Sequence, residues 1–277
     1  MKMKKWTMVA AGAMLAASLG LFGCSGGNEA ASQSSASDDA AAAEGYELLT
    51  PGELTVVLSP DYPPFENLEN GELEGFEVDL FKAIAEEMGL TYKPVYMQFD
   101  TIIPAIAAGG QGDVGVSGFS VDPERAKTID FTESFYIDDQ AVAVMDGSSI
   151  TKENAATALN SPDVTIAVQT GTTGADYAAE NFPNAVIQGF GSSNDCFAAM
   201  QSGQATAVCT NLAVVAQMLK TGYPDAQVVL EAATGEEYAA VVSQDNPGLL
   251  KALDEALATL EANGTIEQLT QKWFAAA

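Results

Sequence analysis

Short apolar segments alternate with segments of helical periodicity from residue 54 onward. Leu54–Leu58 is a run typical of a strand, and apolar residues recur at helical spacing over 76–88, before Gly89 ends that helix. A second helix is predicted over 102–108 and a second strand over 114–117. Because strands and helices alternate, the pattern predicts an α/β fold with a largely parallel sheet.

The same alternation begins again at residue 164. We expect strands over 164–168, 185–187, 205–209 and 238–242, and helices ending at residue 179 and covering 194–201, 247–262 and 265–273. Two similar α/β units in succession predict two lobes, with a cleft between them where strand ends and helix N-termini converge. This arrangement is typical of a binding protein.

The first 23 residues are predicted to be a secretory signal peptide. Lys2, Lys4 and Lys5 form a basic start, and an apolar stretch follows over 6–21. The stretch is short and a polar tract follows it, which argues against a permanent spanning helix. Leu21-Phe-Gly-Cys24 resembles a bacterial lipobox, although Phe22 is bulkier than the residue usual there. The resemblance implies cleavage before Cys24 and a lipid on its sulfur, which would anchor the chain to the outer face of the cell membrane.

Residues 24–45 are predicted to be a disordered linker, because small and polar residues dominate them and little apolar surface is available to bury. The whole chain is strongly acidic, with 11 Lys and Arg against 38 Asp and Glu and a formal net charge of −27. A surface of this charge excludes nucleic acid and bare anionic lipid as expected partners.

Catalytic and metal-binding patterns are scarce. The sequence has no histidine, which excludes Ser-His and Cys-His nucleophilic pairs and the commonest zinc sites, and no metal or cofactor is expected. The acidic segment 66–74 has Leu68 where a calcium-binding loop needs an oxygen ligand, so we predict a solvated hairpin there. Cys196 and Cys209 are compatible with a disulfide or with two buried thiols.

Arg125 is the only arginine in 277 residues. It follows an apolar segment that ends in two hydroxyls, those of Ser117 and Ser120. A guanidinium presents planar, paired donors that fit a carboxylate, and nearby hydroxyls can complete such a site. The alternative is a solvated surface arginine, as most charged residues are exposed.

Several motifs along the chain together resemble those of one family. They are Asp61-Tyr-Pro-Pro-Phe-Glu66, Gly75-Phe-Glu-Val-Asp-Leu80, Phe99-Asp-Thr-Ile-Ile-Pro-Ala105, the segment Pro123 to Tyr136 around Arg125, Gly171-Thr-Thr-Gly174, and Gly264-Thr-Ile-Glu-Gln-Leu-Thr-Gln-Lys-Trp273. Over residues 46–275 the chain resembles the polar amino acid-binding proteins of ABC importers, family 3 of the bacterial extracellular solute-binding proteins.

This resemblance implies a two-lobed periplasmic-binding-protein-like fold (type II), in which each lobe has a central sheet flanked by helices. Lobe 1 would contain residues 46–139 and 238–277, and lobe 2 residues 140–237. Two hinge strands would cross between the lobes near Asp139-Gln140 and Glu237-Tyr238. The lobes would close over a small amino acid, and a membrane permease of the ABC type would accept the closed form.

The resemblance also implies roles for individual residues in holding the ligand carboxylate. Arg125 would bind it from lobe 1, helped by Ser120 and by the segment Ser117-Gly118. Thr172 and Thr173 would bind it from lobe 2, at a helix N-terminus where free N–H groups and the helix dipole favour an anion.

Other positions would contact the ligand side chain. Tyr62 and Phe99 would flank it, although both are equally compatible with ordinary core aromatics. Ser59 and Gln169 match positions that tune specificity, and both are neutral here. Because these two positions carry no negative charge, a strongly cationic ligand would lack one of its expected partners.

Asn211 departs from the family pattern. At this position the relatives have an aspartate that pairs with the ligand ammonium, whereas an amide supplies no charge. Either Glu236, Glu237 or Asp139 near the hinge compensates, or the ligand is not an ordinary α-amino acid.

A second function class remains open from the sequence. An exported enzyme of the cyclohexadienyl dehydratase type could be built on the same scaffold, with a cleft carboxylate such as Glu237 as general acid. The fold alone does not separate binding from catalysis, because function depends on the site.

Overall fold

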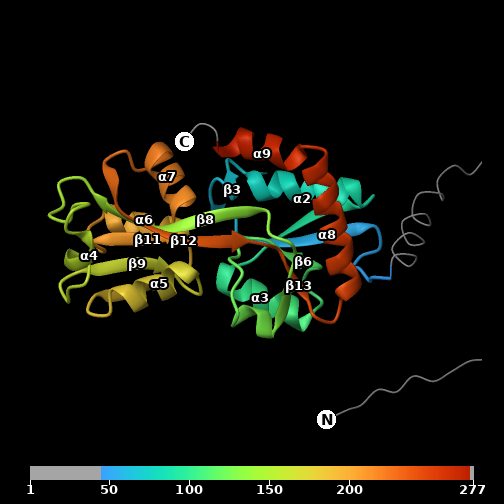
Figure 1. The fold of residues 1–277 in the computed structure, drawn as a ribbon, viewed down its shortest axis with the longest axis horizontal. Helices are drawn as coiled ribbons and strands as arrows, with labels where there is room; N and C mark the ends of the chain where they lie inside the picture. The colour runs from blue at the N-terminus through green and yellow to red at the C-terminus, as the bar shows by residue number, and fades with distance from the viewer. Residues whose placement is uncertain (1–44, 275–277) are drawn as a thin grey trace, which may run out of the picture.

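The computed structural model describes residues 45–274, which form two lobes lying side by side (Figure 1). The predicted two-lobed α/β fold is confirmed. The predicted signal peptide, Cys24 and all but the last residue of the predicted linker lie outside the described residues. Among residues 45–274, no helix has both the length and the apolar character needed to cross a membrane.

Lobe 1 has a five-stranded sheet in the order β5-β1-β6-β13-β7. The strands are β5 (Thr91–Tyr96), β1 (Glu53–Leu58), β6 (Val114–Gly115), β13 (Val241–Ser243) and β7 (Ile129–Phe131). β1 pairs in parallel with both β5 and β6, whereas β13 is antiparallel to both β6 and β7. The carboxyl ends of β1 and β6 therefore lie at the same edge of the sheet.

Helices cover both faces of this sheet. The helices are α2 (Phe76–Glu87), α3 (Phe99–Ala108), α8 (Pro247–Ala262) and α9 (Thr265–Phe274), with α3 on the opposite side from α2 and α9 (Figure 1). Val56 of β1 packs in the core beneath α2 and α8, and its neighbour Val57 packs in the core beneath α3. Because both faces are buried, β1 is apolar at successive positions rather than alternating.

Lobe 2 repeats this topology. Its sheet has the order β10-β9-β11-β8-β12, with two parallel pairs followed by two antiparallel ones. The strands are β10 (Val186–Phe190), β9 (Thr165–Gln169), β11 (Ala207–Asn211), β8 (Tyr136–Met145) and β12 (Ala226–Tyr238), and the helices are α4 (Ala155–Ala158), α5 (Thr173–Asn181), α6 (Ser193–Gln201) and α7 (Leu212–Thr221). The repeat expected from the sequence is therefore present in the strand order.

β8 and β12 connect the two lobes. They pair antiparallel from Met145 opposite Ala226 to Tyr136 opposite Tyr238, with a register shift between Ala232 and Glu236. The shift bends β12 where it leaves lobe 2, and Figure 1 shows both strands running toward lobe 1. The predicted crossing points lie on these strands, and the residue limits of the lobes stay a prediction.

Some predicted elements differ from the structure. The strand predicted over 238–242 is interrupted, because Tyr238 ends β12 and β13 begins at Val241. Helix α3 begins at Phe99, three residues before the predicted start. Cys196 and Cys209 are both buried free thiols, so the disulfide alternative is not adopted.

The hairpin predicted at 66–74 is present, but it is not solvated throughout, because Glu66 is fully buried. β3 (Glu66–Glu69) and β4 (Glu72–Glu74) pair antiparallel, and β2 (Asp61–Tyr62) joins β3 on its other side. The turn residues Asn70 and Gly71 have φ values of 52° and 86°, a conformation that Asn and Gly tolerate.

Candidate ligand site between the lobes

The predicted site residues lie where the carboxyl ends of parallel strands from both lobes meet. Ser59 follows β1 and the segment 117–120 follows β6, while Gln169 and Asn211 end β9 and β11. This is the edge at which open α/β sheets bind ligands. The parallel strand pairing of each lobe therefore brings these residues to the junction of the two lobes.

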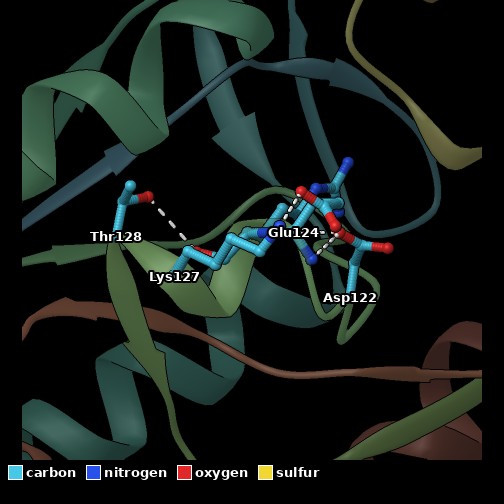
Figure 2. A network of polar contacts seen from close by, with 5 residues as sticks. Asp122, Glu124, Lys127 and Thr128 are labelled. Carbon is cyan, nitrogen blue, oxygen red and sulfur yellow. Dashed lines mark hydrogen bonds and ion pairs between the residues drawn. The ribbon is translucent and has the colours of Figure 1, made fainter.

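Arg125 begins the short 3₁₀ helix η1 (Arg125–Lys127), and a tight polar turn holds it. Asp122 Oδ1 accepts hydrogen bonds from the backbone amides of Glu124 and Arg125, at 2.8 and 3.0 Å. Figure 2 shows this turn, where Thr128 closes the other end of η1 and Lys127 pairs with Glu124. The turn fixes the backbone from which the guanidinium extends.

The guanidinium of Arg125 reaches from lobe 1 to lobe 2. Nη1 donates to the carbonyl of Ser120 at 2.9 Å, and Nη2 donates to the carbonyl of Gly171 at 3.0 Å. The rings of Phe99 and Phe119 stack with centroids 4.8 Å apart, and Arg125 Cζ lies 5.7 and 5.6 Å from those centroids. Burial lowers the pKa of Arg125, although a guanidinium stays charged in proteins. Arg125 is therefore a half-buried cation at the lobe junction, not a solvated surface residue.

Ser120 and Thr173 meet across the cleft around the carboxylate of Glu236. Ser120 Oγ donates to Glu236 Oε2 at 2.5 Å, and Thr173 Oγ1 donates to the same oxygen at 2.7 Å. Gln140 Nε2 donates to Glu236 Oε1 at 2.8 Å. Two residues predicted to hold a ligand carboxylate thus already hold a carboxylate of the protein.

Tyr62 and Asn211 form a second contact between the lobes. The hydroxyl of Tyr62 donates to Asn211 Oδ1 at 2.6 Å and lies 3.1 Å from Thr210 Oγ1. Tyr62 also stacks on Phe65, and both rings are buried. Tyr62 therefore belongs to the lobe 1 core and also contacts lobe 2, and its predicted contact with a ligand stays a prediction.

Asp61 is an acidic residue of the cleft that sequence reasoning did not select. Its Oδ1 accepts from Ser59 Oγ at 2.7 Å, and its Oδ2 accepts from Gln169 Nε2 at 3.3 Å and from the Ser193 amide at 2.8 Å. Burial raises the pKa of Asp61, and the nearby Asp195 acts in the same direction. The sequence does contain a signal for this residue, because Asp61 is the first residue of the motif Asp61-Tyr-Pro-Pro-Phe-Glu66, shortly after strand β1.

The structure directs Ser117 and Gly118 away from Arg125. Ser117 Oγ donates to Glu66 Oε1 at 2.7 Å, and the Gly118 amide donates to both carboxylate oxygens of Glu77, at 3.1 and 3.0 Å. Gly118 has φ 58°, and a Cβ there would lie 2.9 Å from Tyr62 Cε1. These two residues therefore contact buried carboxylates of lobe 1. Their predicted contact with a ligand stays a prediction.

Thr172 is the N-cap of α5. Its Oγ1 accepts from the amide of Ala175 at 3.1 Å and donates to the carbonyl of Gln169 at 2.8 Å. This cap turns the start of α5, and with it Thr173, toward the cleft.

Three buried polar atoms of lobe 2 have no hydrogen-bond partner within the protein. They are Gln140 Oε1, Gln169 Oε1 and Ser193 Oγ, and each belongs to a residue that touches Glu236 or Asp61. Buried polar atoms are nearly always paired. These atoms therefore lie beside the two carboxylates of Asp61 and Glu236 at the junction of the lobes.

A groove of about 550 Å³ separates the lobes beside the contact between Asp61 and Ser193. Lobe 1 lines it with Pro63, Pro64, Gly75 and Trp273, and lobe 2 lines it with Asn194, Asp195, Met218 and Tyr223. Among residues 45–274, no group of His, Cys, Asp and Glu is arranged to hold a metal ion.

Residues 54–276 match the bacterial extracellular solute-binding proteins, family 3. The chain belongs to this family, whose members bind solutes outside the cytoplasm. It is 30% identical to the ABC transporter arginine-binding protein 1 of Escherichia coli, over 78% of this chain and 88% of that protein.

Solved structures show the same architecture. A mutant of the T. maritima arginine-binding protein superposes with a TM-score of 0.74 at 31% identity, covering 81% of this chain and 96% of the other. An ancestral amino acid-binding protein, described as a precursor of cyclohexadienyl dehydratase, has a TM-score of 0.75 at 34% identity, covering 80% and 96%. The similar proteins are two-lobed amino acid-binding proteins.

Glu66 and Glu77 form a buried carboxyl pair behind the cleft. Burial raises the pKa of Glu77 to about 7, and burial together with the charge of Glu77 raises the pKa of Glu66 well above its ordinary value. Glu66 Oε2 has no donor within the protein, so a proton held between the two carboxyls satisfies both groups. The folded state therefore binds more protons than the unfolded state between pH 4.5 and about 7.

We predict that the free energy of unfolding falls as the pH rises from 4.5 through about 7, where Glu77 ionises, and continues to fall until Glu66 also loses its proton. Glu66→Gln keeps the shape, still accepts from Ser117 and can donate to Glu77. It should make the fall smaller and raise the melting temperature at pH 8. Glu69→Gln removes the same charge from an exposed position of β3 and is the control. Equal pH slopes in the two variants would show that the pair does not share a proton.

Proposed function

We propose that this chain is the extracytoplasmic, non-enzymatic capture protein of an amino acid ABC importer. It closes two lobes over one amino acid and presents the closed form to a membrane permease. The observation that carries the proposal is the contact of the Arg125 guanidinium with both lobes, through the carbonyls of Ser120 and Gly171. Membership of the solute-binding family supports the same function.

In this proposal the ligand carboxylate binds beside Arg125. The described hydrogen bonds use two of the five N–H donors of the guanidinium, so donors remain for a ligand. The N-terminus of α5 supplies further N–H groups and a favourable dipole from lobe 2. A carboxylate bound there contacts both lobes and therefore stabilises the closed form.

Asp61 gives a reason to propose a cationic ligand side chain. It is a buried carboxylate that three neutral groups hold, and a cation would offset the burial that raises its pKa. Ser59 and Gln169 are neutral, but both contact Asp61, so the charge that they lack is present one side chain away. The names of the arginine-binding relatives agree with this choice.

The predicted lobe limits and membrane attachment are part of the same proposal. Lobe 1 contains residues 46–139 and 238–277, and lobe 2 contains 140–237. Cleavage before Cys24 and lipidation of its sulfur leave residues 24–45 as a tether that keeps the lobes near the permease. Glu237, the example of a general acid for the enzymatic alternative, is exposed on β12 and does not fit that role.

The test of the carboxylate clamp is calorimetric binding of L-arginine after a thermal-shift screen of all twenty amino acids. Arg125→Lys keeps a charge but loses the paired donors, so affinity should fall by about 1–3 kcal/mol, or roughly 5- to 150-fold, with a larger loss in Arg125→Ala. Lys127→Gln, in the same 3₁₀ helix but exposed, should bind like the wild type. Unchanged affinity in a folded Arg125→Ala protein would contradict the proposed clamp.

The test of the side-chain class is a comparison of two ligands. Asp61→Asn should weaken L-arginine by about tenfold or more, because a charge-assisted bond is lost, and should leave L-glutamine within about threefold. Binding constants of both ligands from calorimetry give the ratio. Equal losses for the two ligands would place Asp61 in lobe closure instead of charge recognition.

The test of anchoring is fractionation of cells that express the full chain. Cys24→Ala removes the only residue that would carry the lipid, so the protein should move from the membrane fraction to the soluble exported fraction or remain uncleaved. A cleaved variant that stays tightly on the membrane would contradict lipid attachment at this residue.

A further inference from the structure

We propose that Glu236 is the specificity-determining residue that binds the α-ammonium of the ligand, in place of the charge that Asn211 lacks. This inference rests on the proposed function, because it assigns the partner of one group of an amino acid in the same cleft.

Glu236 lies at the point where the two lobes and the hinge meet. It follows the register shift in β12, opposite Asp138 of β8. Its Oε2 lies 3.4 Å from Asn211 Nδ2, at the carboxyl end of β11. Its carboxylate therefore occupies the space directly beside the amide at position 211.

The contacts of Glu236 come from both lobes and are all made by neutral groups. Ser120 Oγ of lobe 1 and Thr173 Oγ1 of lobe 2 donate to Oε2, and Gln140 Nε2 and Thr234 Oγ1 donate to Oε1. Among residues 45–274 the three ion pairs are Lys127–Glu124, Lys251–Glu255 and Lys272–Asp79, and none involves Glu236. This carboxylate is partly buried without a cation in contact.

A carboxylate in this state is prepared for a cationic ligand. Part of its desolvation has already occurred on folding, and five hydroxyl and amide groups, that of Asn211 included, donate to it and fix its position. Oε2 already accepts from Ser120, Thr173 and Asn211, so an ammonium would bind there by displacing a neutral donor, the longest bond being the one from Asn211. The charge-assisted hydrogen bond that replaces it is about twice as strong as a neutral one. Asn211 Oδ1 and Ser120 Oγ can accept from the same ammonium.

Arg125 and Glu236 together match the two charges of an amino acid. Arg125 Nη1 donates to the carbonyl of Ser120, and Glu236 accepts from the hydroxyl of the same serine. A positive and a negative group thus flank one residue of lobe 1, and each also contacts lobe 2. A zwitterion can satisfy both, whereas a carboxylate without an amine leaves Glu236 facing a second negative charge.

The opposite role for Glu236 is that of an internal competitor. Ser120 and Thr173 bind a carboxylate of the protein, so Glu236 could occupy donors that a ligand carboxylate would otherwise use. The two roles predict opposite effects of removing the charge, which makes them separable.

The experiment is calorimetry on the full chain with two matched ligand pairs. The pairs are L-arginine with 5-guanidinopentanoate and L-glutamine with glutaramate, and in each pair the second compound lacks only the α-amine. Glu236→Gln should weaken the amino acids by about 10- to 100-fold and leave the deaminated compounds within about threefold of their wild-type affinity. Glu237→Gln removes the same charge from the next, exposed residue and should change neither.

A charge exchange controls for damage to the hinge. The double variant combines Glu236→Gln with Asn211→Asp and so returns one carboxylate to the same space. It should bind amino acids at least about tenfold more tightly than Glu236→Gln alone. Thermal melting of each variant confirms that it is folded. No recovery in a folded double variant would mean that Glu236 acts through hinge structure, which overturns the inference.

Other results of the calorimetry also test the ammonium role of Glu236. Unchanged amino acid affinity in Glu236→Gln, or tighter binding of all four compounds, overturns the ammonium role, and the second result establishes the competitor instead. Both results leave the proposed function intact. Failure of the wild type to bind any of the twenty amino acids would overturn the proposed function and this inference together.

Discussion

The guanidinium of Arg125 contacts both lobes, and the proposed closure over a ligand depends on this contact. Arg125 donates to carbonyls on opposite sides of the cleft, and half-burial makes each lost bond costly. A cation in this position stabilises closure only when anions or dipoles surround it. The carbonyls of Ser120 and Gly171 supply part of that environment, and a ligand carboxylate would supply the rest.

Repeated topology explains why so few residues can build the site. Each lobe presents the carboxyl ends of two parallel strands, and the chain turns toward the cleft directly after each end. A cap at Thr172 and a tight turn at Asp122 then fix the two segments that carry the strongest donors. Arg125, Glu236 and Asp61 are the charged residues on which the proposed recognition of the ligand rests.

The fold was predictable because local patterns reflect burial. β1 is apolar at successive positions since helices cover both faces of its sheet, and α8 has the predicted limits because Pro247 begins it and Asn263 follows it. The strand predicted over 238–242 was wrong in its continuity, since Tyr238 pairs with the hinge strand β8 whereas Val241 pairs with β6 and β7. Long-range pairing of this kind leaves no local signal.

The site was predictable in part for the same reason. Arg125 was conspicuous as a lone arginine, whereas Thr173 and Asn211 were selected through the resemblance to the solute-binding family. The contacts of Asp61 with Ser193 and of Glu236 with Ser120 join residues more than one hundred positions apart, so no local pattern predicts them. The inward orientation of Ser117 and Gly118 depends on Glu66 and Glu77, whose burial becomes visible only in three dimensions.

Lobe closure around an amino acid is the central claim, and small-angle X-ray scattering measures it directly. The wild-type protein would be measured without ligand and at saturation with the amino acid that gives the largest thermal shift. The account predicts a smaller radius of gyration in the ligand-bound protein and no such change in Arg125→Ala. An unchanged radius at saturation would show that the ligand does not close the lobes and would contradict the account.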